Sequence, residues 1–223
     1  MNPKIFQIGF NRTATQAIRA LFLMSGYRSA HNTAYNKNYK KMMPIAETFD
    51  LNMKNNQNLI FGIENYHYYG DIEAVMPKRQ IILHGYTLFE RLDRENPNAI
   101  FILNTRPLES WIFSRLTFDR TYILVYQKYY NLSRDEALNL WIDHYLTHIK
   151  NVKNYFKDRP DKLLEFDIET DSIEDFIKKL EKVNIKGLDK QFWQKTDLSK
   201  AMSPALKEYH ENFQAKEKGV DLI

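Results

Sequence analysis

The stretch that most constrains this chain runs from Lys4 to Leu23, with the sequence KIFQIGFNRTATQAIRALFL. Its first part is a short apolar run closed by Gly9, which is typical of a strand buried on both faces in a parallel sheet. From Thr15 onward the apolar residues recur at helical spacing. The stretch therefore predicts a strand, a tight loop over residues 9–15 and an amphipathic helix.

The residue types in this loop are those of an anion-binding site. Unpaired backbone N–H groups at a helix N-terminus and the helix dipole both favour negative charge there. Arg12 adds a fixed cation, and Thr13 and Thr15 add two hydroxyl donors. The loop is thus predicted to bind phosphate.

The loop departs from the usual nucleotide-triphosphatase motif, GxxxxGK[ST], whose Lys reaches the terminal phosphates and whose Ser or Thr binds magnesium. Ala14 stands at the second Gly position, Thr15 at the Lys position and Gln16 at the Ser/Thr position. The cation comes earlier, at Arg12. These substitutions favour a compact diphosphate-like group held without an essential metal, and they disfavour ATP hydrolysis.

A second strong signal is the apolar run over residues 99–103, which ends in Asn104, Thr105 and Arg106 and is closed by Pro107. A helix is expected to begin within residues 109–115. Because open α/β sheets bind ligands outside the carboxyl ends of their strands, Arg106 and Ser114 are expected near the loop over residues 9–15, if the two strands are parallel neighbours.

The remaining chain predicts further helices and strands. Helices are expected over 39–49, 83–92, 135–156 and 172–183, and strands over 58–64 and 162–168, with a short strand or loop over 27–31. No boundary has the composition of a linker, so we expect a single domain over residues 1–223.

The composition indicates a folded protein without cysteine chemistry or a membrane span. The chain has 223 residues, of which 43% are hydrophobic, with 14 Tyr and 14 Phe, so it can form a large core. It contains no Cys, which excludes disulfides, thiolate metal sites and a Cys nucleophile. No apolar run approaches the roughly 18 residues of a membrane span, and the N-terminus leads directly into the first strand. A soluble cytoplasmic protein is expected.

The net charge is +4, with a sequence pI near 9.0. Spread positive charge favours an anionic cofactor. No dense Lys/Arg stripe or RNA-binding motif is present, so nucleic acid is not expected as a partner.

These motifs together resemble those of sulfotransferases that use 3′-phosphoadenosine 5′-phosphosulfate (PAPS). The family's first motif, G-x-x-[RK]-[ST]-G-T-[ST], is matched at Gly9, Arg12, Thr13 and Thr15. The resemblance implies a three-layer, P-loop NTPase-like α/β fold, in which helices flank a mainly parallel central sheet. It also implies PAPS as co-substrate, with no metal required.

The family's second motif is an Arg at a strand end followed eight positions later by a Ser, matched by Arg106 and Ser114. The resemblance covers roughly residues 4–180. A faint likeness to a late basic loop of the family occurs at Lys218 and Gly219.

The resemblance implies roles for individual residues. Arg12 would stabilise the departing 5′-phosphate, while Arg106 and Ser114 would bind the 3′-phosphate. The implied donor-binding set is Gly9, Asn11, Arg12, Thr13, Ala14, Thr15, Gln16, Arg106 and Ser114. Ala14 replaces the loop Gly of the family, and it would be strained if that position requires a positive φ.

The acceptor hydroxyl also requires a general base. The family uses a His or a carboxylate, and Asp71 is the first candidate. Glu64, His67 and His31 remain as alternatives. By family analogy the acceptor is a hydroxyl on a glycan, a glycolipid or another small molecule. Two rival functions stay open: a P-loop small-molecule or nucleotide kinase, and a non-catalytic relative that binds PAPS or its product adenosine 3′,5′-bisphosphate (PAP).

Overall fold

The computed structural model describes residues 3–118 and 121–193. Its centre is a seven-stranded sheet in the order β4-β3-β2-β5-β1-β8-β9. The strands of this sheet are β1 (Ile5–Gln7), β2 (Ser29–His31), β3 (Thr33–Asn36), β4 (Lys41–Pro44), β5 (Tyr68–Gly70), β8 (Ile100–Thr105) and β9 (Leu163–Asp167). The strands from β2 to β9 in this order pair in parallel, whereas β3 and β4 add an antiparallel edge.

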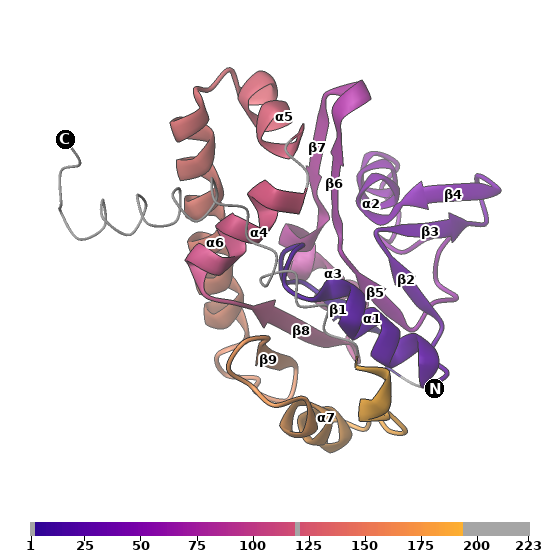
Figure 1. The fold of residues 1–223 in the computed structure, drawn as a ribbon. Coiled ribbons are helices and arrows are strands. Elements are labelled where there is room, and N and C mark those ends of the chain that lie inside the picture. The colour runs from indigo at the N-terminus through magenta and orange to yellow at the C-terminus, as the bar shows by residue number, and fades with distance from the viewer. Residues whose placement is uncertain (1–2, 119–120, 194–223) are drawn as a thin grey trace.

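Helices cover both faces of this sheet (Figure 1). The α-helices are α1 (Thr15–Met24), α2 (Ile45–Lys54), α3 (Phe89–Glu95), α4 (Leu108–Phe118), α5 (Thr121–Tyr130), α6 (Arg134–Phe156) and α7 (Ile173–Lys182). Short 3-10 turns are η1 (Pro77–Arg79), η2 (Gly85–Leu88) and η3 (Lys190–Phe192), and a separate antiparallel hairpin pairs β6 (Glu73–Met76) with β7 (Ile81–His84).

Successive residues of the central strands pack on opposite faces of the sheet. Ile5 and Ile100 contribute to a core shared with α1 and α7. Phe6 and Phe101 contribute to a second core, formed with α2, α3, α4, α5 and α6. Since both faces are buried, the strands read as continuous apolar runs rather than as alternating ones. The expected three-layer α/β fold with a mainly parallel sheet is confirmed.

Several expected elements are confirmed at nearly the predicted bounds. The apolar stripe of the first helix is buried, and the strand predicted over 162–168 is β9. The long helix α6 begins at a capping box, in which the Ser133 side chain accepts from the Glu136 N–H and the Glu136 side chain accepts from the Ser133 N–H. None of the helices in the described ranges is both long and apolar enough to cross a membrane.

The strand predicted over 58–64 is wrong, because this segment is a series of turns and the neighbouring strand is β5. The buried Asn52 side chain donates to the backbone oxygens of Leu59, at 2.8 Å, and Phe61, at 2.9 Å. Gly62 adopts a positive φ of 87°. Its apolar residues Leu59, Ile60 and Ile63 are buried, but the Asn52 side chain, rather than a neighbouring strand, satisfies two of its carbonyls.

The helix predicted over 39–49 is also displaced. Residues 41–44 form β4, and α2 begins only at Ile45. Pro44 explains the boundary, because a proline disfavours helical conformation in the residue before it and is tolerated at a helix start. Similarly, the first residues of the helix predicted over 83–92 belong to β7 and η2, and the α-helix starts at Phe89.

Candidate active site

The loop after β1 is fixed by a side chain from the next strand, β8. The Asn104 Nδ2 donates to the Thr13 backbone oxygen at 2.8 Å and also contacts the Thr13 hydroxyl. A Cβ atom on Gly9 would clash with the backbone oxygen of Asn104, so only glycine fits there. The Thr13 hydroxyl donates to the Phe10 oxygen and is fully buried, so this side chain holds the loop together.

The loop ends in a left-handed residue. Ala14 has φ 57° and ψ 30°, and it precedes Thr15, the buried first residue of α1. Arg12 also has a positive φ, of 67°. No side chain caps the start of α1. Its first N–H groups are therefore left for an anion, which is the condition that favours phosphate binding at a helix N-terminus.

Ala14→Gly is expected to stabilise the protein by about 0.5–1 kcal/mol. A left-handed conformation costs an L-residue roughly 1–2 kcal/mol, and the greater freedom of glycine in the unfolded chain offsets part of the gain. Urea unfolding would measure the change. The matched control is Ala20→Gly in the interior of α1, which should lose about 1 kcal/mol. Equal losses in both variants would contradict a strained Ala14.

The two strand ends predicted to meet do meet. The Arg106 Nη1 donates to the Arg12 backbone oxygen at 3.2 Å, and the Arg12 Nε donates to the Ser114 Oγ at 3.2 Å. The parallel register, with Phe6 opposite Phe101, brings the ends of β1 and β8 to the same edge of the sheet. Arg12, Arg106 and Ser114 thus form one polar cluster beside the loop.

Glu169, which the sequence reasoning missed, belongs to the same cluster. It follows β9 and accepts from the Arg106 Nε at 2.9 Å, and its other oxygen accepts from the Ser110 Oγ at 3.3 Å. The sequence signal that could have found Glu169 is its position just beyond β9, the third strand that ends at this edge of the sheet. An anion that binds Arg106 would compete with this carboxylate.

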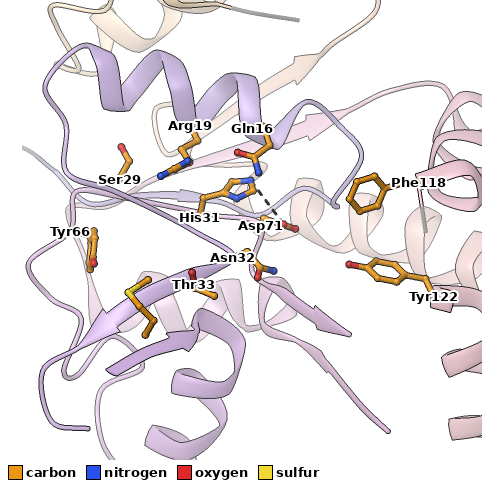
Figure 2. Close-up of a pocket in the computed structure, with 11 residues that line it drawn as sticks. Gln16, Arg19, Ser29, His31, Asn32, Thr33, Tyr66, Asp71, Phe118 and Tyr122 are labelled. Atoms are coloured by element: carbon orange, nitrogen blue, oxygen red, sulfur yellow. Dashed lines mark ion pairs between the residues drawn. The ribbon is translucent and has the colours of Figure 1, made fainter. Parts of the chain in front are cut away.

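A cavity of about 560 Å³ lies on the other side of the loop. Gln16, on the first turn of α1, lines it together with His31 at the end of β2 and Asp71 just after β5. Figure 2 shows that the His31 ring and the Asp71 carboxyl face each other, and their Nε2 and Oδ2 atoms are 4.0 Å apart. Glu64 and His67 are absent from the residues that line this cavity in the described chain.

Burial shifts the pKa values of both facing groups. The pKa of Asp71 is raised to about 7, mainly by desolvation and further by the charge of Glu73. The pKa of His31 is lowered to about 4, by desolvation and by the nearby cation of Arg19. His31 is therefore neutral at neutral pH, whereas Asp71 is close to half ionised. A carboxylate with a pKa near the working pH suits a general base.

Within the polar cluster, Arg12 is the residue that lies next to this cavity, on the side away from Arg106. Its guanidinium stacks on the Phe118 ring at 4.0 Å. Burial and the neighbouring Arg106 lower its pKa, and Asp71 is close enough to raise it again in part. The residue can thus contact groups bound on either side.

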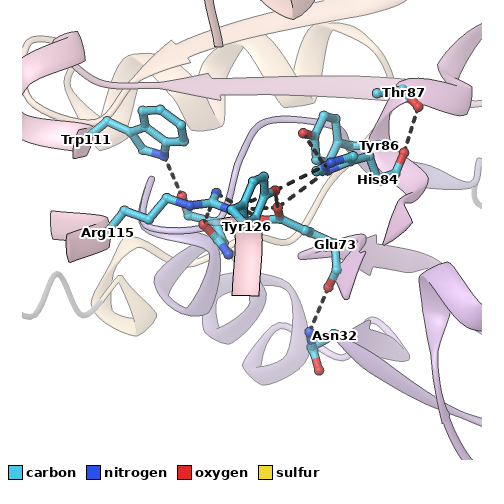
Figure 3. Close-up of polar contacts among 9 residues, drawn as sticks. Asn32, Glu73, His84, Tyr86, Thr87, Trp111, Arg115 and Tyr126 are labelled. Atoms are coloured by element: carbon cyan, nitrogen blue, oxygen red, sulfur yellow. Dashed lines mark hydrogen bonds and ion pairs between the residues drawn. The ribbon is translucent and has the colours of Figure 1, made fainter. Parts of the chain in front are cut away.

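A buried ionic network supports the loop from beneath (Figure 3). Arg115 on α4 donates to Glu73 at 2.7 Å and 3.1 Å, and to the Asn11 Oδ1 at 2.9 Å. The Trp111 Nε1 donates to the Asn11 backbone oxygen at 3.0 Å, and Tyr126 donates to Glu73 at 3.0 Å. Asn11 is therefore held at both its side chain and its backbone. Sequence reasoning missed Arg115 and Glu73, which are far apart along the chain.

His148 on α6 is not among the described residues that line this cavity. His148 is buried and its ring contacts the Ile8 backbone oxygen at 2.7 Å. Within residues 3–118 and 121–193, no group of three or more His, Cys, Asp or Glu could hold a metal ion. Lys218 and Gly219 lie outside the described residues.

Comparison with known families settles the relationship of this chain. A profile described as "Sulfotransferase domain" matches residues 4–117, just over half of the chain. The chain belongs to the sulfotransferase family. The matched span of this sulfotransferase contains both strand-end motifs and the facing pair His31 and Asp71, whereas Glu169 lies beyond it.

Among solved structures, the crystal structure of a sulfotransferase from Alicyclobacillus acidocaldarius is similar. It shares 15% identity with a TM-score of 0.49, and the alignment covers 100% of this chain and 98% of that chain. No curated protein matches the sequence.

Proposed function

We propose that this sulfotransferase transfers a sulfuryl group from PAPS to an acceptor hydroxyl. The observation that carries the proposal is the convergence of the two strand ends, in which Arg12 contacts both Arg106 and Ser114. One adenosine carrying phosphates at its 3′ and 5′ positions requires two anion-binding groups at such a shared edge. This arrangement supports a bisphosphate-type donor.

The residues present fit this donor. The uncapped N-terminus of α1 and the Gly9 loop offer N–H groups to the 5′-phosphosulfate, and Gln16 adds an amide donor. Arg106 and Ser114 would bind the 3′-phosphate, with the guanidinium fork of Arg106 suited to bidentate pairing. The donor supplies the sulfuryl group and a phosphate leaving group, and these residues bind and orient it.

The protein's own groups would then assist transfer. Asp71 would accept the proton from the acceptor hydroxyl, with His31 facing the same point in the cavity. Arg12 would stabilise the negative charge that develops on the 5′-phosphate side. Positioning and charge stabilisation are the main requirements of such group transfers. By family analogy, a hydroxyl on a glycan or glycolipid is the leading acceptor class.

Arg12→Ala is expected to lower kcat by about 10²–10³-fold while leaving PAP affinity nearly intact. Arg106→Ala is expected to weaken PAP binding by about 10–100-fold, because it removes hydrogen bonds to a charged group. Calorimetric titration with PAP and a labelled-sulfate transfer assay across glycans, lipids and phenols would separate the two effects. Equal and negligible effects of both changes would contradict the assignment.

Lys182→Ala is the matched control, because Lys182 is an exposed cation at the last residue of α7 and is not part of the proposed donor or acceptor site. It should change neither quantity. Thermal stabilisation by PAP without magnesium supports the proposal, whereas stabilisation only by Mg-ATP would support a kinase. PAP binding with no transfer to any acceptor would support a non-catalytic relative.

A further inference from the structure

Arg19 lies in the same cavity as the facing pair His31 and Asp71. It is on α1, one turn after Gln16, and residues three apart on a helix are neighbours on its surface. Figure 2 shows both side chains projecting from α1 toward His31. Arg19 is on the Ser29 side of His31, and Asp71 is on the other side.

Arg19 differs from Arg106 and Arg115 in having no acidic partner among the residues that the structure describes. Within the described chain, no acidic side chain lies within ion-pair distance of Arg19, and its buried Nε has no hydrogen-bond acceptor. In contrast, Arg106 pairs with Glu169, and Arg115 pairs with Glu73. A partly buried cation without a partner is costly to a fold, so its presence calls for an explanation.

The neighbouring groups in the cavity do not neutralise Arg19. His31 is neutral at neutral pH, and the Asp71 carboxyl lies beyond it, facing its ring. Ser29, which lies beside Arg19 in Figure 2, is uncharged, as are the lining residues Asn32 and Thr33. The positive charge of Arg19 is therefore directed into the cavity without a counterion from the described chain.

We propose that Arg19 forms an acceptor subsite that recognises an anionic group on the molecule to be sulfated. The acceptor would place its reacting hydroxyl near Asp71 and a carboxylate or sulfate ester against the guanidinium of Arg19, on the other side of His31. A guanidinium binds either anion through two parallel N–H donors. This subsite rests on the proposed function, and it narrows the acceptor from any hydroxyl to a hydroxyl with a negative charge close by.

The test uses the full chain saturated with PAP, so that the phosphate loop is occupied. Methyl β-D-glucuronide and methyl β-D-glucoside differ by one carboxylate, and the 6-sulfate of the glucoside supplies the second anion. Binding of each would be measured by thermal shift and by calorimetric titration, with wild type, Arg19→Gln and Arg19→Lys. The matched control is Arg28→Gln, because Arg28 is an exposed arginine just before β2.

Wild type should bind at least one anionic sugar about 10–100-fold more tightly than the neutral glucoside, and Arg19→Gln should lose that preference. Arg19→Lys should regain part of it, and Arg28→Gln should retain all of it. If the glucuronide binds more tightly than the glucoside 6-sulfate, the preferred anion is a carboxylate; the reverse order identifies a sulfate ester. Without sugar, Arg19→Gln should unfold at the same or a higher temperature than wild type, which a structural role would not produce.

No preference for either anionic sugar in wild type, or a preference that survives Arg19→Gln, would overturn the subsite. Failure of the proposed function has a different signature: either PAP itself would not bind, or PAP and the sugar would both bind and the labelled-sulfate assay would detect no transfer. Normal PAP affinity in Arg19→Gln keeps the two outcomes separate.

Discussion

Replacing Asp71 by asparagine is expected to lower kcat by about 10²–10⁴-fold, the range for loss of a general base. The substitution suits the backbone, because Asp71 has a positive φ of 51° and asparagine tolerates that region. A labelled-sulfate transfer assay would measure the effect. The comparison variant is His31→Gln, since His31 is the rival base in the same cavity. A larger loss in His31→Gln than in Asp71→Asn would reverse the assignment.

The pH dependence of the wild-type enzyme checks the same group. A general base acts when deprotonated, and the pKa of Asp71 is raised to about 7, so the rate should rise as pH increases through about 7. The contribution of Asp71 to the free energy of unfolding changes in the opposite direction and falls as pH rises. Because the folded pKa lies above the unfolded value, Asp71 favours folding at low pH, and this contribution is lost as pH rises from about 4 to about 7.

Asp71→Asn should therefore be no less stable than wild type above pH 7, since it removes a buried charge. Thermal unfolding at pH 8 would test this directly. Loss of activity together with loss of stability would point to a structural carboxylate instead.

Glu73→Ala is expected to destabilise the protein by about 3–5 kcal/mol, because it leaves the guanidinium of Arg115 buried without its counterion. Arg115 and Glu73 are 1% and 2% exposed at their side chains, so water cannot compensate. For a chain of this size each kcal/mol lowers Tm by roughly 2–4 °C. Urea and thermal unfolding would measure the loss.

The double variant Glu73→Leu with Arg115→Met should recover a large part of this stability, because it removes both charges. Asp175→Ala, which breaks the exposed pair with Lys178, should have little effect. If Glu73→Ala behaved like Asp175→Ala, the network would not support the loop. Recovery of stability in the double variant without recovery of PAP affinity would show that Arg115 also positions Asn11.

The free energy of unfolding at acid pH also depends on the Glu73 carboxylate. Desolvation opposes ionisation of Glu73, but the charge of Arg115 outweighs it and lowers its pKa well below the ordinary value. A lowered folded pKa contributes stability above the unfolded value of about 4.5, and this contribution is lost as pH falls below it.

The local parts of the site could be predicted from sequence. Gly9 and Arg12 belong to one contiguous loop, and Arg106 ends one uninterrupted apolar run. Strand and helix periods are properties of short stretches, so these features can be recognised without knowing what packs against them. The placement of Asp71 and His31 in one cavity agrees with candidates taken from the resemblance, although their roles stay predictions.

The expectations that were wrong, and the site residues that were missed, depend on partners that are distant along the chain. The segment over 58–64 has the apolar content of a strand, but the Asn52 side chain accounts for its carbonyls. The pairing of Glu73 with Arg115 joins residues 42 apart, and the isolation of Arg19 is visible only once its surroundings are known. Sequence by itself determined the strand–loop–helix unit around residues 9–15 and the layered α/β class, because local periodicity and residue type govern both. Tertiary structure alone decided which charged side chains are paired and which one has no counterion within the described residues, because burial and counterions come from segments far apart in the chain.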